Sequence, residues 1–290
     1  MRNGGIVKWS KTTMTTNPFT AGVYPDIPEL DYHSCTFGPV DSLSSTEAKR
    51  LLNCPALYRW EKDHPTKQKA VFDFGHVVHA LVLGAGLNLY VHEHESLRTK
   101  TAREDIEAHR AFGEVPISSA DFKRAQNAAD AVFNHRVAGE LFETGTPEQS
   151  IYSQDEKTGV WLRGRIDWET NGTLVDVKTT RDANPSVWRR QAANLDYPLQ
   201  AAWYRTMWEQ VTGHAPRFLH VLVGVEEPHL VSVVEMDAEF LQAGQQRMRM
   251  AIDAFDTCRT FNTWPGYADR VHTLSAPLWY LNTELGQDDE

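Results

Sequence analysis

An acidic and a basic residue alternate on a β-rich segment near the middle of the chain. Residues 173–179 have the composition of a strand, and Asp176 and Lys178 lie two positions apart within it. Because side chains alternate between the two faces of a strand, both share one face, while Val175 and Val177 share the other. A carboxylate and an ammonium so placed could hold a hard cation against a scissile phosphate and serve the attacking water. The alternative is a salt-bridge ladder on a half-exposed strand.

The preceding segment offers a second carboxylate. Residues 159–168 predict another strand, and Asn171-Gly172 between the two strands is a typical hairpin turn, since both residues tolerate a positive φ. If the hairpin forms, Asp167 converges on Asp176 and Lys178. Two carboxylates and a lysine at a strand end are what a metal-dependent phosphodiesterase needs.

A third acid and a polar helix face extend the candidate site. Glu148 follows the turn at Pro147 and begins a strand, and residues 198–212 predict an amphipathic helix. Gln200 and Tyr204 are four residues apart in that helix and therefore share a face. They could clamp a phosphate backbone or position the lysine; alternatively, the tyrosine packs in the core and the glutamine caps its hydroxyl.

A histidine lies among apolar residues in the helix predicted over residues 72–83. His79 follows Gly75 by four positions, and this glycine could permit close approach to the sheet or to DNA. A lone histidine on an apolar helix face most often belongs to the core.

Basic and aromatic residues are interleaved around the two strands. Arg163 and Arg165 alternate on the strand that leads into the first aspartate and could contact phosphates beside the cut. Four more follow the second strand: Arg181, Trp188, Arg189 and Arg190. Such a mixture suits a nucleic-acid strand that is threaded or frayed, although a solvated charged loop is an equal alternative.

Composition bounds the class of protein. The 290 residues are 41% hydrophobic and 10% aromatic, which suffices for a packed core. No apolar run reaches the roughly 18 residues that a membrane span needs, and the polar N-terminus has no secretory signal pattern. Three scattered cysteines favour a reducing cytoplasm. The net charge of −10 argues against broad coating of DNA, but not against a nuclease with an enclosed basic channel.

The order of predicted elements favours one α/β domain. Helices come first, strands with a helix between them follow, and a helix over residues 238–255 comes last. We expect an extended or partly ordered arm over residues 1–40, a single domain over residues 41–270 and an irregular acidic tail over residues 271–290.

In order along the chain, these motifs resemble those of PD-(D/E)XK nucleases, most closely the RecE (exonuclease VIII) branch of phage and prophage exonucleases and more distantly RecB-type nuclease domains. The matching segments, within residues 42–225, are Leu51 to Tyr58, Phe72 to His76, Gly75-x-x-x-His79, Glu148, Gly164-Arg165-Ile166-Asp167, Asp176-Val177-Lys178-Thr179-Thr180 and Gln200-x-x-x-Tyr204. Ile166 replaces the proline of the family name, which the chemistry does not require. The resemblance implies a restriction-endonuclease-like core: a central mixed β-sheet flanked by helices, with a helical N-terminal part.

The resemblance also implies a role for each residue. Asp167, Asp176, His79 and the carbonyl of Val177 would bind one or two Mg²⁺ ions, for which Mn²⁺ could substitute. Lys178 would serve the attacking water, Gln200 and Tyr204 would organise the site, and Glu148 would be a secondary acid. The iron–sulfur cluster of some relatives is excluded, because it needs four cysteines and the chain has three.

The expected function is therefore that of a magnesium-dependent double-strand DNA exonuclease that leaves a single-stranded tail for recombination by annealing. The resemblance implies a ring-shaped homo-oligomer, a RecT-like annealing protein as partner, and a phage or prophage origin in the cytoplasm of a bacterial host, with no membrane association. An endonuclease or repair nuclease of the same fold is the first alternative. A decayed DNA-binding module is the second, and the intact set of Asp167, Asp176 and Lys178 argues against it.

Overall fold

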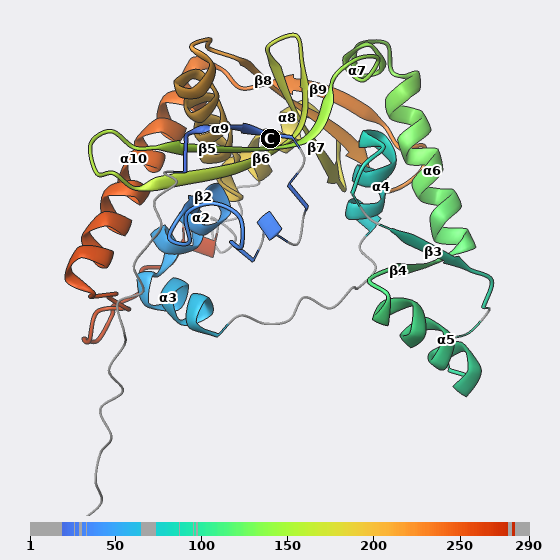
Figure 1. Ribbon diagram of the computed structural model, residues 1–290, viewed down its shortest axis with the longest axis horizontal. Helices are drawn as coiled ribbons and strands as arrows, with labels where there is room; N and C mark the ends of the chain where they lie inside the picture. The colour runs from blue at the N-terminus through green and yellow to red at the C-terminus, as the bar shows by residue number, and fades with distance from the viewer. Residues whose placement is uncertain are drawn as a thin grey trace, which may run out of the picture.

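The computed structural model describes residues 19–25, 27–28, 31–32, 34–64, 74–86, 88–94, 96, 98–277 and 280–281. Within these residues, seven strands form a mixed sheet with helices on both faces (Figure 1), in the order β1-β5-β6-β7-β8-β9, with β2 paired to β6. The predicted mixed sheet flanked by helices is thereby confirmed. The strands are β1 (Gly22–Tyr24), β2 (Leu43–Ser44), β5 (Thr146–Gln154), β6 (Trp161–Thr170), β7 (Thr173–Thr180), β8 (Arg217–Gly224) and β9 (Val231–Glu235).

The predicted hairpin forms the centre of this sheet. β5, β6 and β7 are antiparallel neighbours, and the β6–β7 turn places Asn171 and Gly172 at φ of 48° and 76°. β7 pairs with β8 in parallel, so a crossover must join them, and α8 (Pro185–Asn194) and α9 (Tyr197–Thr212) supply it. The crossover carries the glutamine–tyrosine helix back over the strand that bears Asp176.

Two hydrophobic cores cover the two faces of the sheet. Leu174 lies in the first core, on the side of α9, and Val175 and Val177 lie in the second. The alternation predicted for this strand is therefore confirmed. The first face carries α2 (Ser45–Asn53), α3 (Pro55–Asp63), α9 and α10 (Ala238–Phe261), and the second carries α4 (Phe74–Leu83), α6 (Ser119–Asn134) and α7 (Arg136–Leu141).

A small unit stands beside the second core. β3 (Leu89–His92) and β4 (Val115–Ser118) form a separate parallel pair, with α5 (Lys100–Ala111) in the connection between them. This unit lies at the lower right of Figure 1, near α4 and α6.

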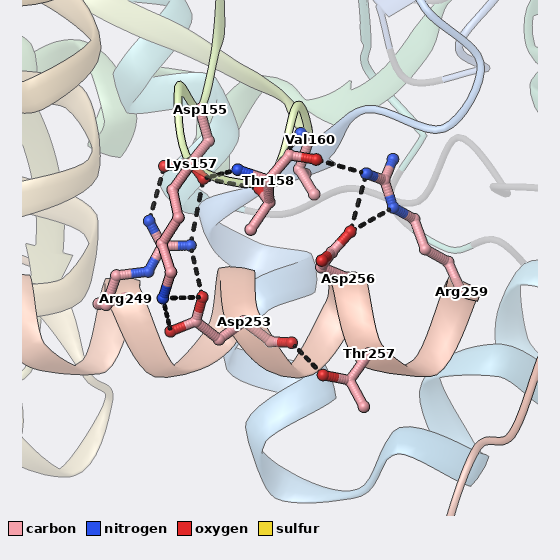
Figure 2. Close-up of polar contacts among 9 residues, drawn as sticks. All are labelled: Asp155, Lys157, Thr158, Val160, Arg249, Asp253, Asp256, Thr257 and Arg259. Carbon is pink, nitrogen blue, oxygen red and sulfur yellow. Dashed lines mark hydrogen bonds and ion pairs between the residues drawn. The ribbon is translucent and has the colours of Figure 1, made fainter. Parts of the chain in front are cut away.

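The last helix is longer than predicted and anchors the β5–β6 turn. α10 continues to Phe261 rather than ending at residue 255, because Cys258 prolongs its buried face and Asn262 ends it in a left-handed conformation. Figure 2 shows the contacts: Arg249 of α10 donates from Nη1 and Nη2 to the two carboxylate oxygens of Asp155, at 2.6 and 3.2 Å. Lys157 in the same turn donates to Asp253 at 3.1 Å.

Parts of the predicted arm and tail lie outside the described residues, namely 1–18, 26, 29–30, 33, 278–279 and 282–290. The described part of the arm contributes β1, which pairs with β5, and a small aromatic cluster around Tyr152. The domain boundaries at residues 40 and 270 stay predictions. None of the helices within the described ranges combines the length and apolarity needed to cross a bilayer.

Candidate active site

The candidate site forms where β6 and β7 separate. Backbone pairing of these strands runs from Thr170↔Thr173 to Trp168↔Val175. One step further along, the side chain of Asp167 takes the place of a backbone partner, since its Oδ2 accepts a hydrogen bond from the N–H of Val177 at 2.9 Å. We call Asp167, Asp176, Val177 and Lys178 the fork site.

Asp176 is held by two side chains of the expected set. The Nζ of Lys178 lies 2.8 Å from Oδ1 and 2.7 Å from Oδ2 of Asp176, and Gln200 Nε2 donates to Oδ1 at 2.9 Å. The carboxylate is only 1% exposed, and burial raises its pKa to about 6, a shift that the ammonium opposes. Burial by itself lowers the pKa of Lys178, but the carboxylates of Asp176 and Asp167 outweigh it and leave that pKa raised. The pair is therefore a buried, charge-matched unit.

His79 joins this site rather than a purely apolar core. It extends from α4, with Nε2 3.0 Å from Asp167 Oδ2 and Nδ1 3.6 Å from Glu148 Oε1. Burial lowers the pKa of His79, but the charge of Asp167, its hydrogen bond and the charge of Glu148 together raise it to about 9. In turn, burial raises the pKa of Asp167, and the imidazolium outweighs burial and lowers it.

Glu148 connects the site to a second cation. Glu148 adopts a φ of 54° within β5, and its Oε2 accepts a hydrogen bond from Nε of Arg165. Burial raises the pKa of Glu148, and Arg165 only partly opposes this. Arg165 is also fixed by the carbonyl of Ile27, at 2.9 Å from Nη1. This arginine therefore lies at the edge of the site as a partner of the acid.

Tyr204 of α9 packs against the strand that carries Asp167. Its ring packs against Gly164 of β6, where an added Cβ would come within 2.7 Å of Tyr204 Cε1. Burial raises the pKa of the Tyr204 hydroxyl to about 12. Gln200, one turn earlier in α9, bonds the carboxylate of Asp176 instead of capping this hydroxyl.

The structure corrects the expected surface position of two DNA-binding candidates. Arg163 is 5% exposed and pairs with Glu47, whose Oε2 lies 2.8 Å from Nη2, because this glutamate closes the capping box of α2 and needs a buried counter-charge. Trp188 is 3% exposed and stacks on Tyr197. Of the other candidates, Arg165 is half-buried and paired with Glu148. The other three are exposed: Arg181, Arg189 and Arg190.

Three nearby residues were missed by the reasoning from sequence. Two of them are Lys49 of α2 and Tyr197 of α9. The Nζ of Lys49 lies 5.0 Å from the centroid of the Tyr197 ring, and the Nζ of Lys178 lies 5.3 Å from it. His220 of β8 is the register partner of Asp176, and its Nε2 lies 4.0 Å from Oδ2. Burial lowers the pKa of His220 to about 3, so its ring is neutral. No local signal identifies them: Tyr197 and His220 depend on the crossover that brings β8 beside β7, and Lys49 depends on the packing of α2 against α9.

The donors at the fork site suit a hard divalent cation. Asp167 and Asp176 are carboxylates on adjoining strands, and the carbonyl of Val177 is an additional oxygen donor. The carboxylates raise the pKa of His79 to about 9 and also raise that of Lys178, which favours positive charge on both side chains beside the two acids. Among the described residues, no three His, Cys, Asp or Glu side chains surround a common metal position. The fork-site residues therefore fit a divalent cation by the chemistry of their donor atoms and by their charge.

Comparisons with known proteins identify the family and support the fold. Residues 44–277 match a family described as a PDDEXK-like domain of unknown function (DUF3799). No curated protein matches the chain. A candidate exonuclease from Eubacterium rectale matches in structure with a TM-score of 0.61 and 13% identity, over 90% of this chain and 99% of that one. A phage-related exonuclease from Haemophilus somnus 129PT has a TM-score of 0.31 and 12% identity, over 64% and 95% of the two chains. The first match supports a shared fold, and the second is too distant to carry an argument.

Proposed function

The chain belongs to the PDDEXK-like domain family of unknown function DUF3799, and on that premise we propose that it is a divalent-metal-dependent exodeoxyribonuclease. A PD-(D/E)XK fold supports a nuclease. The finer proposal is that it degrades one strand from duplex DNA ends and leaves a single-stranded tail. The observation that carries the proposal of a metal-dependent nuclease is the convergence of Asp167, Asp176 and Lys178 where β6 and β7 separate, with Gln200 bound to Asp176 at 2.9 Å.

Each residue of the fork site has a separate task in this proposal. Asp167 and Asp176 would hold Mg²⁺, which lowers the pKa of a bound water and stabilises charge on the reacting phosphate. Gln200 fixes Asp176 through Oδ1, and the N–H of Val177 fixes Asp167 through Oδ2. Both carboxylates are thus oriented by neutral donors.

Lys178 supplies the mobile positive charge. Its ammonium contacts both oxygens of Asp176. In this proposal, the side chain turns from that carboxylate to a phosphate oxygen or to the attacking water when DNA binds. Exposed Arg181, Arg189 and Arg190 on and after the β7 end suit contacts with the DNA backbone.

The partners are also proposals. A tail produced in this way is a substrate for a single-strand annealing protein, and a ring of copies would let a chain of net charge −10 enclose DNA in a locally basic channel. Light scattering of the purified protein, with and without a duplex end, measures the assembly. We also propose a cytoplasmic location in a bacterial host.

The substrate test uses linear duplex, nicked circle and covalently closed circle, each with Mg²⁺. We expect loss of linear DNA alone, abolished by EDTA and by Lys178→Ala, and restored after EDTA by excess Mn²⁺. Lys157→Ala is the matched control, because that lysine lies on the distant β5–β6 turn. Cutting of closed circles would favour an endonuclease of the same fold, and no cutting with any divalent metal would favour a DNA-binding module.

A further inference from the structure

A buried histidine behind the fork site has no assigned task. His220 is 0% exposed on β8, and Asp176 is its register partner on β7. Aromatic rings surround it: the centroid of Phe218 lies at 5.0 Å and that of Trp188 at 5.1 Å. An apolar aromatic side chain would fit this environment better than an imidazole does.

Neither ring nitrogen of His220 has a hydrogen-bond partner among the described residues. A neutral imidazole carries one N–H donor and one acceptor nitrogen, and burying them unpaired costs free energy. Such a cost at a buried position calls for an explanation, such as a partner that is engaged in another state of the site.

The carboxylate of Asp176 offers that partner. His220 Nε2 lies 4.0 Å from Asp176 Oδ2, which is too long for a hydrogen bond. Oδ1 of this carboxylate already accepts from Gln200, whereas the only close contact of Oδ2 among the described residues is the ammonium of Lys178 at 2.7 Å. A shift of roughly 1 Å would bring Nε2 and Oδ2 to hydrogen-bonding distance.

We propose that His220 is a positioning residue for Asp176: its Nε2–H donates to Oδ2 when Lys178 leaves the carboxylate for the phosphate or the water. Outer-shell donors of this kind orient a metal-binding carboxylate. A neutral donor does so without adding positive charge beside the cation, which an ammonium cannot do. The inference rests on the proposed function, because it assumes that Asp176 binds a divalent metal.

Metal affinity tests this inference without recourse to turnover. Isothermal titration of the metal-free full chain with Mn²⁺ is compared for wild type, His220→Phe and His220→Gln. We expect the phenylalanine variant to raise the Kd for Mn²⁺ about tenfold or more. The glutamine variant, which retains an N–H donor of similar reach, should recover most of that loss.

Folding is measured separately by thermal unfolding. His220→Phe removes two unpaired polar atoms, so we expect its Tm to equal or exceed that of wild type. If the phenyl ring, which is larger than imidazole, destabilises the fold, His220→Leu is used in its place. The matched control is His92→Phe, another buried strand histidine with an unpaired ring nitrogen, in the β3–β4 unit. Its affinity for Mn²⁺ should stay unchanged.

Wild-type affinity in a folded His220→Phe variant would overturn the inference and leave the proposed function intact. A glutamine variant as weak as the phenylalanine variant would also overturn it, because the loss would then reflect packing. If the wild-type chain binds no Mn²⁺, the proposed function fails together with the inference.

Discussion

Replacing Gly164 by alanine is expected to disturb the site through Tyr204. An added Cβ would lie 2.7 Å from Cε1 and 2.9 Å from Cδ1 of the Tyr204 ring, and 3.2 Å from Cγ2 of Ile151. The tyrosine ring is 8% exposed and Ile151 is fully buried, so neither can turn away into solvent. The helix that carries Tyr204 must therefore move outward, and Gln200 moves with it.

The size of the effect follows from the overlap. Insertion of one methyl group into a packed core costs about 1–3 kcal/mol. For a domain of this size, each kcal/mol lowers the Tm by roughly 2–4 °C. We expect a Tm lower by about 2–12 °C. We also expect kcat to fall, because the hydrogen bond from Gln200 to Asp176 is displaced.

A double-mutant cycle isolates the contact. Tyr204→Leu removes the ring atoms that the methyl group would meet, so the combination with Gly164→Ala should cost less than the sum of the single changes. Gly22→Ala is the matched control in another strand, where the nearest atom to an added Cβ is 3.5 Å away. Additive free energies of unfolding in the cycle, or an unchanged Tm for Gly164→Ala, would refute the reasoning.

Three further changes probe the surroundings of the site. Gln200→Leu removes the donor to Asp176 Oδ1, so kcat should fall about 10–100-fold with an unchanged circular dichroism spectrum; equal rates would contradict this role. Burial raises the pKa of Glu47, but the charge of Arg163 outweighs burial, so the net shift of this pKa is downward. Glu47 therefore stabilises the fold at pH values above its unfolded pKa, and this stabilisation is lost as the pH falls through its folded pKa. Glu47→Gln should cost on the order of 3 kcal/mol at pH 7 in urea unfolding and flatten the loss of stability on acidification; a slope like that of wild type would refute it. Asp155→Asn breaks the α10 contact in Figure 2 and, because the pair is partly exposed, should cost about 1 kcal/mol, less at high salt; a cost independent of salt would contradict an ion pair.

The centre of the fold could be predicted from local signals. Asn171-Gly172 between two β-rich segments specifies a hairpin, and the alternation around Asp176 specifies which side chains share a face. Spacing by four in α9 likewise placed Gln200 and Tyr204 on one face. Each of these relations spans few residues, which is why periodicity is sufficient to find them.

Long-range relations were out of reach for the same reasoning. Arg163 was expected to contact DNA because it alternates with Arg165 on the strand that leads into Asp167, but its partner Glu47 lies in a helix far earlier in the chain. Trp188 was expected beside exposed arginines, yet it packs against His220, a residue of a strand beyond the crossover. Burial of this kind depends on tertiary neighbours that no local pattern contains.

Short elements were missed for a different reason. β1 and β2 contain three and two residues, too few to show a period of two, and they depend on pairing with β5 and β6. The β3–β4 pair has four residues in each strand, which is also too few to show a clear period. Pairing across the sheet, rather than propensity, sets these segments.

The most direct test of the central claim is the rate of nucleotide release from linear duplex DNA with Mg²⁺, measured side by side for wild type, Lys178→Met and Lys157→Met. Both variants lose an ammonium, but only the first loses it at the fork site; the other lysine contacts Asp253 on α10. We predict a fall of about 10²–10⁴-fold for Lys178→Met and a wild-type rate for Lys157→Met. Equal rates for the two variants would contradict the assignment of the fork site as the catalytic centre.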